Sequence, residues 1–184
     1  MSTIKSSKEF NEIINYINNK NYNQALKSTE TLSKNYPKEK ILTKLFAIIY
    51  FKLMDWNNAI KYYEKILPLE NEKWKIYINL GVACFRYGKI SKSIDAFKKA
   101  INDNPNLDLA YENLAISYLE IGRFEDAIEN FIIALKINKN NLNSQENLIN
   151  VLSLSKPKNK DQHYLVKLDD QINKIRDKHE INNI

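Results

Sequence analysis

The feature that most constrains the fold of this chain is a repeat of similar residues every 34 positions. The segment YENLAISYLEIGRFEDAIENF at 111–131 is matched by YINLGVACFRYGKISKSIDAF at 77–97 and by TKLFAIIYFKLMDWNNAIKYY at 43–63. A fixed period of this length is typical of proteins in which similar units stack in a row. One such unit cannot bury its apolar residues alone, so neighbouring units must cover one another. The period therefore predicts a stack of units, and it directs the search for function to a groove.

Each period contains two apolar faces with helical spacing. Tyr111, Leu114 and Tyr118 are three and four positions apart, which places them on one side of a helix. A second face with similar spacing follows Gly122, and the same order is found around Gly88 one period earlier. A glycine between two helices can adopt the left-handed conformation that ends the first of them. The sequence thus predicts a pair of helices in each period.

Small residues and prolines recur where a helix pair needs them. Ala47, Gly81 and Ala115 occupy one position of three successive periods, and we expect the partner helix to approach closely there. Pro37 and Pro105 follow the second helices, where proline prevents the helix from continuing. We expect helices in the ranges 6–19, 22–35, 39–53, 56–69, 73–87, 90–103, 107–121, 124–138, 141–155 and 161–180.

Together these residues resemble the tetratricopeptide repeat. The resemblance is most specific in 108–141 and 74–107, although Cys84 and Ser93 replace an aromatic residue and an alanine of the family pattern, and Lys139 replaces a proline. It implies an all-α fold, a right-handed α-solenoid of about four and a half helix-turn-helix repeats. The expected solenoid covers 6–155, with repeats at 6–39, 40–73, 74–107 and 108–141 and a half repeat at 142–155.

The end of the chain is expected to form a separate helix. Residues 156–160 are polar and contain a proline, so we expect a linker there. In the range 161–180, apolar residues follow spacings of three, four and three: Leu165, Leu168, Ile172 and Ile175. We expect this helix to cap the apolar end of the stack. Alternatively, the same stripe joins two copies of the chain in a homo-oligomer.

Charge and composition argue against nucleic-acid and membrane partners. The net charge is +6, but only 3 of the 28 cationic residues are arginine, and none of the basic runs is longer than two residues. Phosphate recognition favours arginine, so we expect no nucleic-acid partner. The most apolar stretch, 41–54, contains two lysines and is too short to span a bilayer. We therefore expect a cytoplasmic protein without membrane insertion.

The chain offers no pattern of reactive residues. Cys84 is the single cysteine, and it occupies a position that is aromatic in other repeats, so we expect a buried structural thiol. His163 and His179 are 16 positions apart and lie outside the repeats. A metal site or a cysteine nucleophile would need such groups close together. We expect no enzyme activity, no cofactor and no metal.

The resemblance implies that the first helix of each repeat lines a concave groove that binds an extended peptide. Asn79, Asn113 and Asn147 share one position of that helix and are similar to an asparagine ladder. An asparagine amide can pair with both the C=O and the N–H of a peptide unit. Asparagine is abundant throughout this chain, so its recurrence at this position also has a compositional explanation.

Apolar and charged residues share the same face of the first helices. Ile48, Val82 and Ile116 recur at one register, either as the floor of the groove or as packing between adjacent first helices. The expected cationic groove residues are Lys44, Lys52, Lys75 and Arg86. Glu120 occupies the register of Lys52 and Arg86, so we expect the groove to be basic in the earlier repeats and acidic in the later ones. The carboxylate clamp of chaperone-binding family members is not matched, because Ile48 and Leu109 replace its polar and basic residues.

The leading prediction is a protein–protein interaction scaffold that binds a partner peptide or protein segment in the concave groove. One alternative is a targeting or regulatory module at the N-terminal side of a larger enzyme of the transferase or oxygenase type. The other is a self-associating assembly factor that uses the stripe in 161–180. Whether the gene has an in-frame stop codon after residue 184 tests the first alternative. Light scattering, which compares the mass of the full chain with that of residues 1–157, tests the second.

Overall fold

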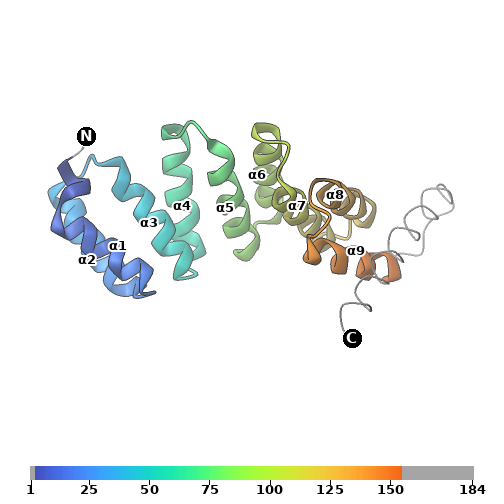
Figure 1. Cartoon of the computed structure of the whole chain (residues 1–184), viewed down its shortest axis with the longest axis horizontal. Helices are drawn as coiled ribbons and strands as arrows, with labels where there is room; N and C mark the ends of the chain where they lie inside the picture. Colours follow the sequence, from blue (N-terminus) through green and yellow to red (C-terminus); the bar gives the residue numbers. More distant parts are fainter. Residues whose placement is uncertain (1–2, 155–184) are drawn as a thin grey trace. The chain divides into compact units, whose positions relative to one another are not determined.

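The computed structural model describes residues 3–154, which contain helices and no strand (Figure 1). The chain divides into two compact units, Met1–Asn104 and Pro105–Ile184. The described helices of the first unit are η1 (Thr3–Ser6), α1 (Lys8–Asn18), α2 (Tyr22–Asn35), α3 (Lys40–Lys52), α4 (Trp56–Ile66), η2 (Leu67–Leu69), α5 (Lys73–Arg86) and α6 (Ile90–Asp103). Those of the second unit are α7 (Asp108–Glu120), α8 (Phe124–Ile137) and α9 (Leu142–Leu154). The predicted all-α class is confirmed for the described residues.

Helix ends differ from the predicted ranges where local chemistry intervenes. The first helix was expected from residue 6, but it begins after Ser7, whose Oγ accepts a hydrogen bond from the Phe10 N–H at 3.2 Å. A serine at this position satisfies an N–H that has no partner within the helix. The range 56–69 is divided, because Pro68 cannot donate a backbone hydrogen bond, and α4 gives way to the 3-10 helix η2. The predicted linker at 156–160 and helix at 161–180 lie outside the described residues.

The same turn joins the two helices of each full repeat. Its central residue has a left-handed φ at four positions 34 residues apart: Lys20 (59°), Met54 (59°), Gly88 (82°) and Gly122 (72°). The next residue donates its N–H to a carbonyl five residues back, in the pairs Asn21–Tyr16 (2.8 Å), Asp55–Tyr50 (3.0 Å), Lys89–Cys84 (2.8 Å) and Arg123–Tyr118 (2.9 Å). This is the Schellman pattern, which satisfies carbonyls at the end of a helix. The expected left-handed glycines are confirmed, and two non-glycine residues adopt the same conformation.

The paired helices approach closely at the small residues that the sequence singled out. A Cβ atom added to Gly81 of α5 would lie 2.6 Å from Cε1 of Phe97 in α6. Ala47 of α3 and Ala115 of α7 occupy the same register and are fully buried. Glycine is therefore required at 81 because the aromatic ring of the partner helix occupies the space of a side chain.

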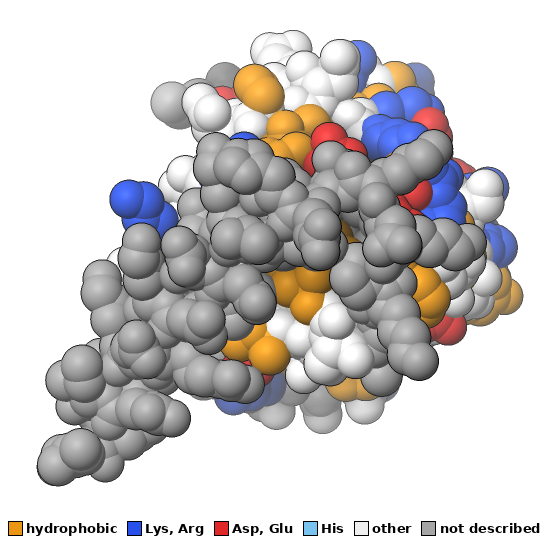
Figure 2. All heavy atoms as spheres, turned by 90° about the vertical axis from the view of Figure 1, so that its right-hand side faces the viewer, with side chains coloured by type: hydrophobic (Ala, Val, Ile, Leu, Met, Phe, Trp, Pro, Cys, Tyr) orange, Lys and Arg blue, Asp and Glu red, His pale blue; other side chains and the backbone are white. Residues whose placement is uncertain are grey.

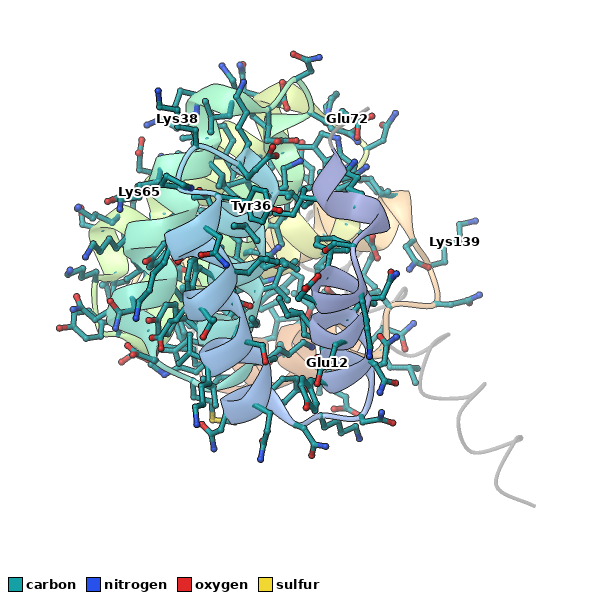
Figure 3. All side chains as sticks on the ribbon, turned by 90° about the vertical axis from the view of Figure 1, so that its left-hand side faces the viewer. Glu12, Tyr36, Lys38, Lys65, Glu72 and Lys139 are labelled. Atoms are coloured by element: carbon teal, nitrogen blue, oxygen red, sulfur yellow. The ribbon has the colours of Figure 1, made fainter. Side chains whose placement is uncertain are left out.

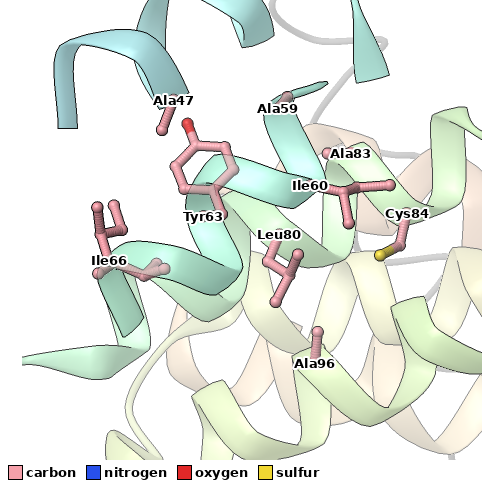
Figure 4. Packing of buried hydrophobic residues seen from close by; sticks show 10 residues of the cluster. Ala47, Ala59, Ile60, Tyr63, Ile66, Leu80, Ala83, Cys84 and Ala96 are labelled. Carbon is pink, nitrogen blue, oxygen red and sulfur yellow. The ribbon is translucent and has the colours of Figure 1, made fainter. Parts of the chain in front are cut away.

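The core of the first unit is formed by clusters that join neighbouring helices along the chain. Figure 4 shows one of its clusters, in which Tyr63 of α4 lies between Ile66 of the same helix and Leu80 of α5. The cluster also contains Ala47 from α3 and Ala96 from α6. Each helix of this unit packs against the next one along the chain, as Figure 1 shows for α3, α4 and α5. Burial is thus shared between neighbouring repeats, as expected for a stack.

We predict that Met54→Gly raises the free energy of unfolding by about 0.5–1 kcal/mol, because a non-glycine residue is strained at this φ and glycine is not. Met54 is 70% exposed, so little packing is lost. Gly88→Ala is expected to lower the free energy by a similar amount. Urea unfolding of both variants tests this, and shifts of the two midpoints in the same direction would contradict it.

Gly81→Ala is expected to destabilise the protein by about 1–3 kcal/mol, although alanine favours helices, because its methyl group overlaps the Phe97 ring. The matched comparison is Gly81→Ala combined with Phe97→Leu, which removes the ring atoms nearest the new methyl group. We expect part of the loss to be recovered in the double variant, as measured by thermal unfolding. A loss that is the same with leucine at 97 would mean that the contact is not its cause.

Candidate functional site

One stripe of α3 remains accessible in the first unit. Ile41, Lys44, Ile48 and Lys52 are spaced three, four and four residues apart, which places them on one side of the helix. Ile48 is 39% exposed, whereas Ile49, next to it in sequence, is fully buried. The two lysines on either side of this aliphatic side chain can attract carboxylates of a partner, which makes the stripe a candidate contact.

A related stripe lies on α5, the first helix of the next repeat in this unit, where Val82 and Arg86 follow Ile48 and Lys52 by 34 positions. It consists of Lys75, Asn79, Val82 and Arg86, at spacings of four, three and four. Val82 and Asn79 are half-buried, while Lys75 and Arg86 are exposed. Both helices therefore present cations on either side of an aliphatic residue. We call the residues Lys44, Ile48, Lys52, Lys75, Val82 and Arg86 the cationic face.

Two of the four cations of this face are paired with carboxylates of one loop. Lys44 Nζ lies 2.5 Å from Glu70 Oε1, and Lys75 Nζ lies 2.5 Å from Glu72 Oε2. Glu70 and Glu72 belong to the segment between η2 and α5. No residue of the described part forms an ion pair with the other cation of either stripe, Lys52 on α3 or Arg86 on α5. The sequence predicted these cations but gave no sign of the pairing.

In the second unit, the corresponding face of the first helices carries asparagine and glutamate instead of cations. Asn113 donates its side-chain N–H to the Leu109 carbonyl at 2.7 Å, one turn back in α7. Ile116 and Asn147 are half-buried, and Glu120 is exposed. The predicted ladder thus places Asn79 in the first unit and the other two asparagines in the second. An incoming peptide would have to compete with the Leu109 carbonyl for the Asn113 amide.

Glu112 is a buried carboxylate that the sequence did not single out. Only 6% of it is exposed. Its Oε2 accepts from the Ser144 hydroxyl at 3.4 Å and its Oε1 from the Asn143 amide at 3.5 Å, both in α9. One turn earlier in α7, Asp108 Oδ2 accepts from Asn141 at 3.2 Å. Polar contacts of α7 therefore contribute to holding α9 in the second unit. The sequence gave one sign that this position is buried: the apolar Ile78 occupies the same position of the previous repeat.

A cleft of about 310 Å³ lies between α1 and α2. In Figure 3, Glu12 lies toward one end of this cleft and Tyr36 toward the other. Its lining consists of Glu9, Glu12, Lys27, Ser28, Thr31, Leu32, Asn35 and Tyr36. Glu12 takes the register of Leu80 and Leu114, and the smaller polar Thr29 takes the register of Phe97. The first repeat therefore has less apolar volume between its helices than the later repeats.

Cys84 is buried in the core, as predicted, with 1% of its surface exposed. Burial raises the pKa of its thiol above the ordinary value, although nearby lysines, chiefly Lys92, act in the opposite direction. A raised pKa lowers the thiolate fraction at neutral pH, which opposes a nucleophilic role. Within residues 3–154, no three His, Cys, Asp or Glu side chains are grouped as a metal would require.

Charges of both signs are mixed on the surface. Figure 2 shows Lys and Arg side chains, in blue, gathered along one edge with Asp and Glu side chains, in red, among them. Some of these opposite charges form ion pairs, such as Lys92–Glu64 and Lys99–Asp95, with N–O distances of 3.6 and 2.7 Å. None of the helices in the described range is long and apolar enough to cross a membrane.

Comparisons with known proteins agree with this architecture. A family model described as tetratricopeptide repeat matches residues 96–129. The human intraflagellar transport protein 88 homolog is 32% identical over 120 residues, which are 61% of this chain and 14% of that protein. A crystal structure of MamA has a TM-score of 0.77 at 18% identity and covers 96% of this chain and 97% of its own. The first TPR of Spaghetti (RPAP3), bound to HSP90 peptide SRMEEVD, has a TM-score of 0.59 at 20% identity, over 64% of this chain and 93% of that one. These matches confirm the predicted helical-repeat solenoid fold.

Glu112→Ala is expected to destabilise the chain by about 1–3 kcal/mol and to expose α9, because the buried Ser144 hydroxyl loses its acceptor. Hydrogen exchange should show faster exchange in α9, and urea unfolding should show the lower stability. Glu146→Ala is the control, since Glu146 occupies the same register of the next repeat and is exposed. Equal effects of the two substitutions would show that the buried contacts do not hold α9.

Proposed function

Because this chain carries the tetratricopeptide repeat, we propose that it is a protein–protein interaction scaffold that binds a segment of a partner protein along its first helices. The observation that carries the proposal is the cationic face of α3 and α5, where Ile48 is 39% exposed between two lysines. Cations that flank an exposed aliphatic side chain can complement a partner's carboxylates while the aliphatic side chain contacts its apolar residues. The equivalent residues Val82 and Arg86 on α5 offer a second aliphatic and cationic pair in the next repeat.

The comparison with a peptide-bound relative supports this use of the fold. The first TPR of Spaghetti (RPAP3) was solved with an HSP90 peptide, SRMEEVD, in which acidic residues are interspersed with methionine and valine. This chain shares the fold of that protein at 20% identity. Its own side chains differ from a carboxylate clamp, since Ile48 and Leu109 are aliphatic and are 39% and 50% exposed. We therefore propose peptide binding without assigning the same peptide.

The asparagine ladder is part of the proposal. Asn79, Asn113 and Asn147 are each half-buried on a first helix, and an amide can hold a peptide backbone by one donor and one acceptor. Asn113 would first exchange its hydrogen bond to Leu109 for one to the partner. Replacing all three by Ala should weaken partner binding while leaving the helical content unchanged.

The proposal assigns the chain no catalysis, cofactor or metal of its own and places its action in the cytoplasm. Cys84, the one thiol, is buried and has a raised pKa, so it is a poor nucleophile. The two alternatives drawn from the sequence, a module of a larger enzyme and a self-associating factor, remain predictions. The apolar stripe in 161–180, on which self-association depends, lies outside the described residues.

The proposal predicts that replacing both aliphatic residues of the cationic face abolishes partner capture. Proteins retained from the native cell extract by the immobilised chain would be compared with those retained by Ile48→Asp/Val82→Asp. The control is Met54→Asp, which places the same charge on an exposed residue of a turn, where aspartate tolerates a left-handed φ. A partner lost from the double variant and kept by the control supports the proposal. Identical retention by all three proteins would contradict it.

A further inference from the structure

Resting on the proposed function, we infer that the cationic face takes an acidic-apolar segment of a partner protein, and that the α4–α5 loop competes with it. Glu70 and Glu72 of this loop already occupy Lys44 and Lys75. The carboxylates of the loop thus occupy cations that the partner's carboxylates would otherwise bind. The partner's carboxylates bind Lys52 and Arg86 first.

The charges of the face select the kind of partner. Each stripe has two cations, and the aliphatic residue between them is Ile48 on α3 and Val82 on α5, where Asn79 also lies between the cations. Carboxylates complement the cations, and aliphatic or aromatic side chains complement the residues between them. A nucleic acid would satisfy the cations through its phosphates, but it would leave Ile48 exposed. A protein segment that alternates acidic and apolar residues satisfies both.

The two occupied cations are held with different strength. Lys44 joins α3 to a residue 26 positions later, and the two side chains are 37% and 26% exposed. The Lys75–Glu72 pair lies within three residues, and its side chains are 58% and 67% exposed. Exposed ion pairs are weak, whereas partial enclosure reduces screening by water and salt. Glu70 is therefore the stronger competitor, and its removal should favour an acidic partner more than removal of Glu72.

The other two cations are open to a ligand. Lys52 and Arg86 stand at equivalent positions of the last turns of α3 and α5, and both are exposed. Neither has an ion-pair partner among residues 3–154. A cation in the last turn of a helix also offsets the partial negative charge of that helix end, so its position there is favoured without a ligand. A carboxylate of the partner can bind these two groups without displacing any part of the chain.

Fluorescence anisotropy with three synthetic peptides tests the inference on the full chain. The labelled peptides have equal length, and leucine alternates with Glu, Gln or Lys. We expect the Glu peptide to bind about tenfold or more tightly than the Gln peptide at low salt, and we expect no binding of the Lys peptide. The advantage of the Glu peptide should shrink in about 0.5 M salt, where the Debye length falls to a few ångströms.

Variants with matched controls locate the effect. Lys52→Glu/Arg86→Glu should weaken binding of the Glu peptide about tenfold or more, while Lys34→Glu/Lys61→Glu, which changes exposed residues of second helices, should leave it nearly unchanged. Glu70→Gln should strengthen binding about threefold, and Glu72→Gln should do so less. Glu64→Gln removes an ion pair elsewhere, with Lys92, and should have no effect. Circular dichroism checks that each variant is folded. If Lys52→Glu/Arg86→Glu unfolds, Lys52→Gln/Arg86→Gln is used instead.

The outcomes separate this inference from the scaffold function. Equal binding of the Glu and Gln peptides would overturn the acidic partner while leaving peptide binding intact. Binding of none of the three would count against both. A labelled single-stranded oligonucleotide that binds as tightly as the Glu peptide would replace the inference with general polyanion binding. Unchanged affinity in Glu70→Gln would refute the competing loop alone.

Discussion

The structure depends on the close contact between the two helices of each repeat. In the third repeat this contact is so tight that the Phe97 ring occupies the space where a side chain at 81 would lie. Ala47 and Ala115 mark the same approach in the neighbouring repeats and are fully buried. Because interiors are densely packed, this contact fixes how far each helix is rotated about its axis. The rotation determines which residues of the first helix remain outside.

The repeated turn adds a second constraint with the same period. Its left-handed residue and its hydrogen bond to a carbonyl five residues back recur at equivalent positions of four repeats. Identical turns return the chain in the same way each time, so equivalent residues of successive first helices face the same side within a unit. On α3 and α5 those residues are the aliphatic Ile48 and Val82 and, one turn later, the cationic Lys52 and Arg86. A surface suited to a partner thus follows from a contact that serves stability.

Much of this fold could be read from the sequence, because helix spacing and small residues act locally. The ranges 22–35 and 90–103 were predicted to the residue, and Gly88 and Gly122 were placed in their left-handed turns. The left-handed Met54 was not foreseen, although the period aligned it with those glycines. Its side chain is exposed, so no apolar pattern marked the position.

The ion pairs and buried polar contacts of the candidate site could not be predicted in the same way. The cations of the face were predicted, Lys52 and Arg86 from their shared register, but the pairing of Lys44 with Glu70 joins residues 26 positions apart through a loop without periodicity. Glu112 was also missed, since its burial depends on what α9 places against it. Long-range polar contacts are set by tertiary structure, and a pattern of residue types does not encode them.

The most direct test is an NMR titration of the isotope-labelled chain with the native partner's binding segment, or with an acidic-apolar peptide. The account predicts that shift changes concentrate on the stripe residues of α3 and α5, with smaller changes on the exposed faces of α4 and α6. Changes that centre on the second helices, or on the cleft between α1 and α2, would contradict it.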